Sequence, residues 1–269
     1  DPRLAQKQAA AVRALDWVES GMVVGLGTGS TAVWAIRGLG ERLADGRLRD
    51  IVAIPSAEAS ATEARAAGIP LVTFDDHPVI DLTIDGADEV DPDLNLIKGY
   101  GGALLREKVV AQTTRREVIV VDDSKPTRRL GTRCHVPVEV LRFACATERG
   151  FLESLGATVV LRPDGVGPFV TDEGNWILDA AFGPIADAPV LAAALEARAG
   201  IVEHGLFLGL TADVLVATET GRGRRCRRSL LGAVRGHRRP TPGDRPLRVP
   251  HRPRHPRRSR QTRHRGRSS

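Results

Sequence analysis

Short apolar runs that end in a glycine-rich or acidic turn constrain the fold of this 269-residue chain more than any other feature. Residues 22–26 read as a strand that runs through a glycine-rich turn into a helix, and residues 79–84 read as a strand that ends in an acidic turn. Similar runs at 51–54, 71–73 and 118–121 alternate with helix-forming segments. Because such alternation is typical of a parallel sheet covered by helices, we predict an α/β fold with a Rossmann-like domain.

The order of elements changes after about residue 134. From there the chain reads as strand, helix, two strands, helix and a last strand over 201–207, which is the split motif of ferredoxin-like folds. We therefore predict an α/β catalytic domain over 1–134, to which 208–220 return, and a smaller ferredoxin-like α+β domain over 135–207.

The end of the sequence has a different composition. Residues 221–269 hold 18 arginines and one aspartate, with no lysine and no aromatic Phe, Trp or Tyr. The whole chain carries a net charge of only +6, so the preceding part is acidic. Like charges and few apolar side chains predict a disordered tail. We favour a reading-frame shift in a GC-rich gene as its origin; the alternative is a genuine nucleic-acid-binding extension.

No apolar run approaches the roughly 20 residues that span a bilayer, so we expect no membrane contact. The three cysteines form no CxxC pair, and the histidines show no metal-ligand spacing. These features predict a cytoplasmic protein without disulfides and without a metal or other cofactor.

The first turn could cradle an anion. Glycines allow a tight backbone, and free N–H groups at a helix start attract negative charge, here beside two hydroxyl side chains. The turn is neither a Walker loop nor a dinucleotide fingerprint, so a simple strand-to-helix turn is the alternative. The residues concerned are Thr28, Gly29, Ser30 and Thr31.

The second turn opens a cluster that could hold a small polar molecule and move a proton on it. Asp85 and Asp88 follow a strand, at the edge where α/β sheets bind ligands. Lys98, a glycine-rich stretch and Glu107 come within about two dozen residues. The alternatives are aspartates that cap the turn and a lysine and glutamate on the solvated surface.

Taken together, the motifs resemble type A ribose-5-phosphate isomerase, from about residue 4 to about residue 220. The matching segments, in family order, are 25–31, 85–90, 98–104, 106–108 and 122–125. The resemblance implies a cofactor-free interconversion of ribose 5-phosphate and ribulose 5-phosphate, an α/β domain with an inserted α+β domain, and a homodimer or homotetramer. It also implies that Glu107 is the catalytic glutamate and that Lys125 is a substrate lysine.

An aldose–ketose isomerisation moves a proton between C1 and C2 through an enediol or enediolate, so it needs a base and oxyanion stabilisation. We predict Glu107 as general base and Lys98 as oxyanion stabiliser, with Asp85 and Asp88 on the sugar hydroxyls. The predicted substrate-binding residues are Thr28, Gly29, Ser30, Thr31, Gly86, Ala87, Gly99, Tyr100, Gly101, Lys125 and Lys7. The family often has glycine at the position of Tyr100, which would be strained if the backbone there needs a positive φ.

Two other functions fit parts of the pattern. A non-catalytic sugar-phosphate sensor with a nucleic-acid-binding tail would need the binding groups but no base such as Glu107. An amino-sugar deaminase would need a histidine near the base, and none occurs between Asp85 and Glu107. The sequence therefore favours the isomerase.

Overall fold

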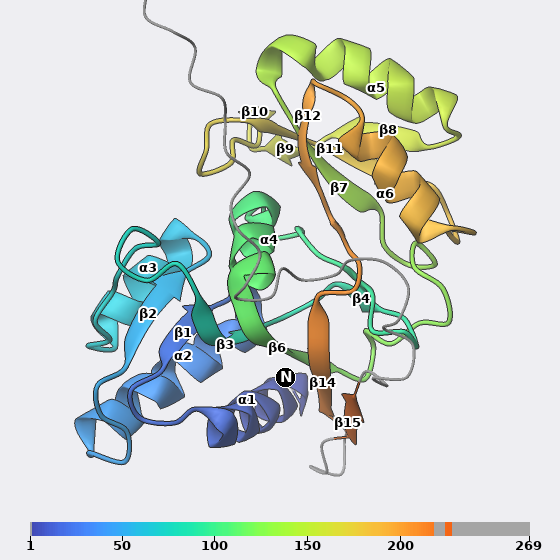
Figure 1. Ribbon diagram of the computed structural model, residues 1–269. Helices are drawn as coiled ribbons and strands as arrows, with labels where there is room; N and C mark the ends of the chain where they lie inside the picture. Colours follow the sequence, from blue (N-terminus) through green and yellow to red (C-terminus); the bar gives the residue numbers. More distant parts are fainter. Residues whose placement is uncertain (1, 218–223, 228–269) are drawn as a thin grey trace, which may run out of the picture. The chain divides into compact units, whose positions relative to one another are not determined.

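The computed structural model describes residues 2–217 and 224–227 (Figure 1). Its main sheet has six strands in the order β15-β14-β6-β3-β1-β2. The bounds of these strands are β1 (Val23–Leu26), β2 (Val52–Pro55), β3 (Ile80–Asp85), β6 (Thr114–Asp122), β14 (Thr211–Ala217) and β15 (Arg224–Arg227). All neighbours pair in parallel except β15, which is antiparallel to β14.

The strand order reverses at β1. The chain passes from β1 outward to β2, then returns to the other side of β1 to form β3. In open α/β sheets the loops at such a reversal part, and the crevice beyond the carboxyl ends of the two strands binds ligands. The crevice in this chain lies after Leu26 and Asp85.

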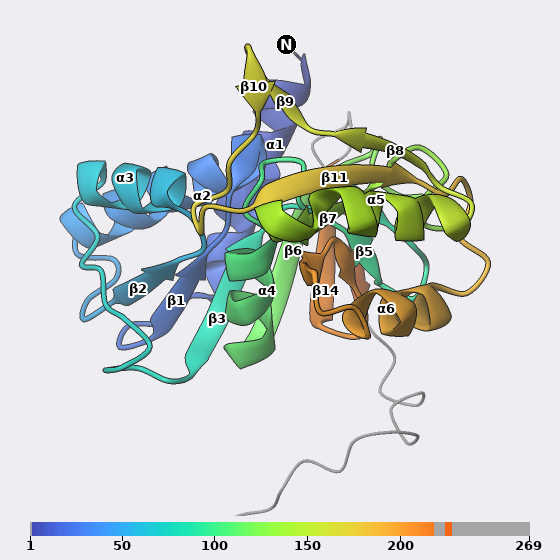
Figure 2. The ribbon, with the colours of Figure 1, turned by 90° about the horizontal axis from the view of Figure 1, so that it is seen from above.

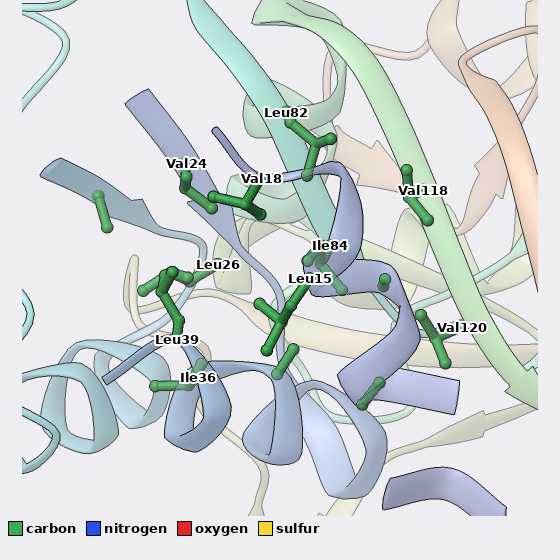
Figure 3. Packing of buried hydrophobic residues seen from close by; sticks show 14 of the residues in the cluster. Leu15, Val18, Val24, Leu26, Ile36, Leu39, Leu82, Ile84, Val118 and Val120 are labelled. Carbon is green, nitrogen blue, oxygen red and sulfur yellow. The ribbon is translucent and has the colours of Figure 1, made fainter. Parts of the chain in front are cut away.

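Helices cover both faces of the main sheet (Figure 2). On one face lie α1 (Pro2–Ala14), which continues as a 3-10 turn over Leu15–Trp17, α2 (Gly29–Ala44) and α3 (Glu58–Ala66); α4 (Leu104–Thr113) lies on the other. A hydrophobic core lies between the helices α1 to α3 and the face of the sheet that they cover (Figure 3). The residues labelled there are Leu15, Val18, Val24, Leu26, Ile36, Leu39, Leu82, Ile84, Val118 and Val120.

The continuous apolar run 118–121 of strand β6 is buried on both faces of the sheet. Val118 and Val120 belong to the core under α1, whereas Ile119 and Val121 pack on the opposite face with Phe207. Period-2 alternation between two apolar environments leaves no polar positions in such a run.

A second sheet has four antiparallel strands in the order β12-β7-β11-β8. The elements are β7 (Val136–Val140), α5 (Cys145–Ser154) after a 3-10 turn over Arg142–Ala144, β8 (Thr158–Leu161), β11 (Trp176–Ala181), α6 (Ala188–Glu196) and β12 (Ile201–His204). This is the predicted ferredoxin-like arrangement, and the α/β fold class is confirmed. We propose that 135–207 is a domain inserted between 1–134 and 208–220, because all four strands fall within it.

Two small sheets complete the described fold. One is the hairpin of β9 (Pro163–Asp164) and β10 (Gly167–Pro168). The other has the order β13-β5-β4, with β4 (Glu89–Val90), β5 (Leu96–Ile97) and β13 (Leu206–Phe207). In this sheet β4 follows the acidic turn, β5 precedes Lys98, and β13 leads the chain back toward β14 of the main sheet.

Two of the predicted strands differ from the structure. The run 71–73 forms only a single bridge, between Leu71 and Ala53. The run 201–207 is broken at Gly205, whose N–H donates to Pro137 O (2.7 Å) and whose carbonyl accepts from Lys98 N (2.9 Å). A Cβ at Gly205 would lie 2.3 Å from Lys98 O, so glycine lets the chain change sheets at this close approach.

Part of the predicted tail also differs. Disorder was predicted from residue 221, but 224–227 form β15 on the edge strand β14. The edge offers unpaired backbone groups, and Asp213 on β14 accepts a hydrogen bond from Arg225 Nε (2.8 Å), which explains how an arginine-rich segment pairs there. The remainder of the predicted tail, 228–269, lies outside the described residues.

Among the described residues, no helix has the length and apolar character required to cross a bilayer.

Candidate active site

A pocket of about 560 Å³ opens where β1 and β3 end and α2 begins. The sequence predicted that this edge of the sheet would bind a ligand, and nearly every predicted site residue lines the pocket. The lining residues are Lys7, Thr28, Gly29, Ser30, Thr31, Gly86, Ala87, Asp88, Lys98, Gly99, Tyr100, Gly101, Glu107, Val120, Val121, Asp122 and Lys125. Asp85 lies behind this lining, 1% exposed.

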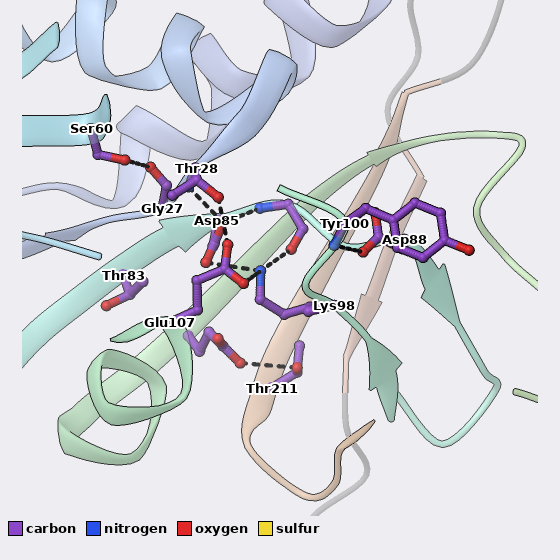
Figure 4. Close-up of polar contacts among 12 residues, drawn as sticks. Gly27, Thr28, Ser60, Thr83, Asp85, Asp88, Lys98, Tyr100, Glu107 and Thr211 are labelled. Atoms are coloured by element: carbon purple, nitrogen blue, oxygen red, sulfur yellow. Dashed lines mark hydrogen bonds and ion pairs between the residues drawn. The ribbon is translucent and has the colours of Figure 1, made fainter. Parts of the chain in front are cut away.

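Asp85 joins the two loops (Figure 4). Its Oδ1 accepts from Thr28 N (3.1 Å) and Gly86 N (2.7 Å). A Cβ at Gly27 would lie 2.1 Å from Asp85 Oδ1 and 2.6 Å from Asp85 Cα, so glycine permits this approach. Ser60 Oγ donates to Gly27 O (2.6 Å) and holds the first loop from α3. Both oxygens of Asp85 are occupied, because Oδ2 pairs with Lys98.

Lys98 is buried among acceptors. Its Nζ lies 2.9 Å from Asp85 Oδ2 and 3.5 Å from Glu107 Oε2, and it donates to Gly86 O (2.7 Å). Burial disfavours the ammonium, but the charges of Asp85 and Glu107 outweigh burial, and the pKa of Lys98 is raised. Lys98 is therefore a fixed positive charge on the pocket wall.

Glu107 lies on α4 and is 4% exposed. Thr28 Oγ1 donates to its Oε1 (2.5 Å), so this hydroxyl is not used to cap α2. Burial raises the pKa of Glu107 to about 7; Lys98 opposes the shift and the charge of Asp85 adds to it. Oε2 is buried and accepts no hydrogen bond within the described residues. Glu107 thus combines a pKa near neutrality with an oxygen that accepts no hydrogen bond, as a proton-transfer group requires.

Asp88 and Tyr100 meet at the glycine-rich loop. Tyr100 N donates to Asp88 Oδ2 (3.1 Å), and burial raises the pKa of Asp88 against the effect of this bond. Tyr100 itself is unstrained: among the described non-glycine residues only Asp50 and Leu94 have a positive φ. Gly99 (φ 110°) and Gly102 (φ 84°) take that conformation instead. The suggestion of strain at Tyr100 is therefore wrong, and its ring stacks on His135 with 4.3 Å between centroids.

The start of α2 and two lysines also line the pocket. Lys7 Nζ donates to Ser30 Oγ (3.3 Å) and lies 3.7 Å from Asp122 Oδ2. Lys125 lines the same pocket. Because no side chain caps α2, its first N–H groups remain available, and the two lysines make this part of the pocket suited to an anion.

Sequence reasoning missed two carboxylates near the site. Asp122 ends β6 at the same sheet edge as Asp85, so the rule that identified Asp85 could have found it. Glu117 lies in the same strand, is 1% exposed, and accepts from Thr211 Oγ1 (3.0 Å). Burial raises its pKa to about 7, with Lys98 opposing. A charged residue beside an apolar strand run was the available signal.

The raised pKa of Glu117 predicts a pH dependence of stability. Between its unfolded value, about 4.3, and about 7, the folded chain holds a proton that the unfolded chain releases, so this contribution to stability is lost as pH rises through that window. Glu117→Gln should flatten the fall in the free energy of unfolding by up to about 1.4 kcal/mol per pH unit, the linkage limit for one proton. Denaturant titrations from pH 5 to 8 measure this, with a Glu63→Gln variant, at a partly exposed position on α3, as control. An unchanged slope would remove Glu117 as the titrating group.

Comparisons with known proteins agree with this geometry. Residues 52–221 match the family model of ribose 5-phosphate isomerase A (phosphoriboisomerase A). The chain is 59% identical over 218 residues to ribose-5-phosphate isomerase A of Desulfatibacillum aliphaticivorans, covering 81% of this chain and 95% of the relative. It is 56% identical over 217 residues to that of Chloroflexus aurantiacus, covering 80% and 91%.

Solved structures show the same relationship. A D-ribose-5-phosphate isomerase in complex with phospho-erythronic acid has a TM-score of 0.81 and 38% identity, covering 83% of this chain and 98% of that one. Ribose 5-phosphate isomerase from Plasmodium falciparum gives the same values. With a family model over more than half of its length and relatives of this identity, the chain belongs to the ribose-5-phosphate isomerase A family.

Proposed function

We propose that Glu107 is the general base with which this chain interconverts D-ribose 5-phosphate and D-ribulose 5-phosphate through an enediolate. The observation that supports this role is the buried Oε2, which faces the ammonium of Lys98 at 3.5 Å and has no hydrogen-bond donor among the described residues. A carboxylate so placed can take a proton from C2 of the aldose and return it to C1, or the reverse.

The phosphate is proposed to bind at the start of α2. Free N–H groups of Gly29, Ser30 and Thr31, together with Lys7 and Lys125, supply donors and positive charge on one wall of the pocket. Glu107 and Lys98 line the pocket as well, so the reacting carbons would extend from the phosphate toward them. The related D-ribose-5-phosphate isomerase forms a complex with phospho-erythronic acid, which like ribose 5-phosphate carries a phosphate on a polyhydroxylated carbon chain.

Lys98 is proposed to stabilise the enediolate oxygen. A buried, fixed ammonium needs no reorganisation as negative charge develops, which is where electrostatic catalysis gains most. Asp85 was predicted to touch the sugar, but its two oxygens hold Thr28, Gly86 and Lys98. We therefore assign to Asp85 the positioning of Lys98. Asp88 lines the pocket, so it keeps its proposed role: it hydrogen-bonds a sugar hydroxyl and assists the opening of the sugar ring.

The sensor alternative has less support. A sensor needs no pocket-lining carboxylate whose pKa lies near 7 and whose second oxygen accepts no hydrogen bond, and Glu107 has both properties. The tail on which nucleic-acid binding would depend lies, apart from 224–227, outside the described residues.

No three His, Cys, Asp or Glu side chains group as metal ligands anywhere in 2–217 or 224–227.

The direct test is an isomerase assay of the purified full chain. Ribose 5-phosphate should be converted to a ketopentose phosphate, and in deuterated water the product should carry deuterium at C1. A purified, folded chain that binds ribose 5-phosphate without converting it would support the sensor and contradict the proposal.

The pKa of Glu107 predicts how the rate responds to pH. A base acts only when it is deprotonated, so activity should fall as pH drops through about 7. We expect kcat/KM to fall about fourfold from pH 8 to pH 6.5, the range above the titration of a sugar phosphate near pH 6. Initial rates in constant ionic strength buffers measure this; a flat profile over that range would contradict a base with this pKa.

We also propose a homodimer or homotetramer that works in the cytoplasm. Phe143 is fully exposed and Val190 is 65% exposed, which suits a surface covered by another copy. All three cysteines, Cys134, Cys145 and Cys226, are free thiols, as a reducing compartment favours. Light scattering of the purified chain would give the oligomeric state.

A further inference from the structure

We propose that Arg162, from the second sheet, is a positioning residue that fixes the loop carrying Lys98 and contacting Asp88. This inference rests on the roles proposed above for those two residues. Arg162 follows β8 directly and is 9% exposed. It lines no part of the pocket, so it acts on the reaction through the loop or through its charge, which opposes the rise that burial causes in the pKa of Asp88.

The side chain of Arg162 binds backbone carbonyls of the loop. One terminal nitrogen donates to Gly99 O (2.8 Å) and to Tyr100 O (3.1 Å). The other nitrogens bind Asp179 on β11 as a fork: Nε donates to Oδ2 (3.0 Å) and the second terminal nitrogen donates to Oδ1 (2.5 Å). A planar guanidinium can satisfy a carboxylate and two carbonyls at once, which an ammonium cannot do.

One peptide group is held from both sides. The carbonyl of Gly99 accepts from Arg162, and the N–H of the same peptide unit, on Tyr100, donates to Asp88 Oδ2 (3.1 Å). Because the peptide is planar, fixing its oxygen also fixes the direction of its N–H. Arg162 therefore orients the Tyr100 N–H toward Asp88 and anchors Gly99, the residue next to Lys98.

Other contacts confine the loop to the same place. Lys98 N donates to Gly205 O (2.9 Å) at the point where the chain leaves β12. A Cβ at Gly102 would lie 2.3 Å from Phe169 Cζ, and Phe169 N donates to Arg162 O (2.8 Å). Residues in or next to the second sheet thus contact the loop at Lys98, Gly99, Tyr100 and Gly102.

Asp179 also holds the outer side of the loop. His135 Nε2 lies 3.1 Å from Asp179 Oδ1, while the His135 ring stacks on Tyr100. His135 N donates to Tyr100 Oη (3.1 Å). Asp179 therefore holds both Arg162 and His135, and each of these residues contacts Tyr100.

The first test compares Arg162→Met with Arg198→Met. Arg198 makes an equivalent fork with a buried carboxylate, to Glu148 Oε2 (2.9 Å) and Oε1 (3.1 Å), but within the described part of the chain it forms no hydrogen bond with the loop. We expect Arg162→Met to lower kcat by about 10- to 100-fold with KM changed less than about threefold, since small misplacements of reacting groups cost this much. Arg198→Met should keep kcat within about twofold at a similar loss of Tm. Equal kcat in the two variants would overturn the proposal.

The second test asks whether the effect passes through the loop's lysine. In a Lys98→Met background, Arg162→Met should lower kcat by a clearly smaller factor than in the wild type, because one of the two groups that it positions, Lys98 and Asp88, is gone. Losses that multiply would overturn the proposal and make Arg162 a general support of the fold. Lys98→Met alone reports on the proposed role of Lys98, so the two ideas fail separately.

Conservative variants keep the proposal testable if Arg162→Met does not fold. Arg162→Lys can reach one carbonyl but cannot hold the Asp179 fork, so it should recover part of kcat. Asp179→Asn keeps the size and one acceptor, and should lower kcat in the same direction by a smaller factor. A folded Arg162→Lys and a folded Asp179→Asn that both keep the wild-type kcat would contradict the positioning role.

Discussion

Glu107→Gln should lower kcat by about 10²-fold or more with little change in substrate affinity. A general base acts on the barrier to proton transfer and contributes about 10²–10⁴-fold, whereas glutamine keeps the shape and an acceptor for Thr28 Oγ1. Progress curves with ribose 5-phosphate give kcat and KM, and the deuterium content of recovered ribose 5-phosphate reports the proton transfer itself.

The matched control for Glu107→Gln is Glu117→Gln. Both carboxylates are almost fully buried and both have a pKa raised to about 7, but only Glu107 lines the pocket. Glu117→Gln should therefore lose less than about tenfold in kcat. If the two variants lose equally, or if Glu107→Gln keeps near-normal turnover, the base is a different group.

Lys98→Met is expected to lower kcat by about 10²–10³-fold, the range seen when one preorganised donor to a developing oxyanion is removed. The variant also leaves Asp85 and Glu107 as neighbouring buried carboxylates without their cation, so the pKa of Glu107 should rise and the acid limb of the rate profile should move to higher pH. Rates from pH 6.5 to 9 measure both effects.

Lys108→Met is the matched control for Lys98→Met. Lys108 lies on α4 and is buried as Lys98 is; its Nζ lies 2.5 Å from Glu203 Oε1 and 4.9 Å from the Phe207 ring, which Lys98 approaches at 5.5 Å. It does not line the pocket, so its loss should lower Tm with kcat within about threefold. A normal rate in Lys98→Met would remove Lys98 from the reaction.

The sequence predicted the main sheet well because its apolar runs, apart from 71–73, are strands, and because the glycine-rich and acidic turns mark where β1 and β3 end. The acidic turn after β3 and the glycine turn after β1 could be placed at one sheet edge from this rule alone. The strand break at Gly205 could not, since it depends on Pro137 and Lys98, far away in the chain. Nor could β15, which forms because β14 is an edge and Asp213 faces Arg225.

The site was predictable in its members but less so in their arrangement. Motif spacing brings Glu107 and Lys98 near one pocket, and the structure does the same. Spacing gives no sign that Asp85 would be occupied by Thr28, Gly86 and Lys98, because those bonds depend on a glycine at position 27. The family resemblance raised the question of strain at Tyr100, but the positive φ angles of this loop fall on Gly99 and Gly102 instead.

The loop that carries Lys98 is closed by partners that are made much later in the chain. Arg162 is 63 residues beyond the carbonyl that it binds, and the parallel strand β14 joins β6 only at Thr211–Ala217. Contacts over such separations require large loops to close and therefore form slowly. During synthesis, the N-terminal helices and β1 to β3 can pair early, but the site acquires its geometry only when the last parallel strand has emerged. Catalytic competence is thus a late event in the folding of this chain.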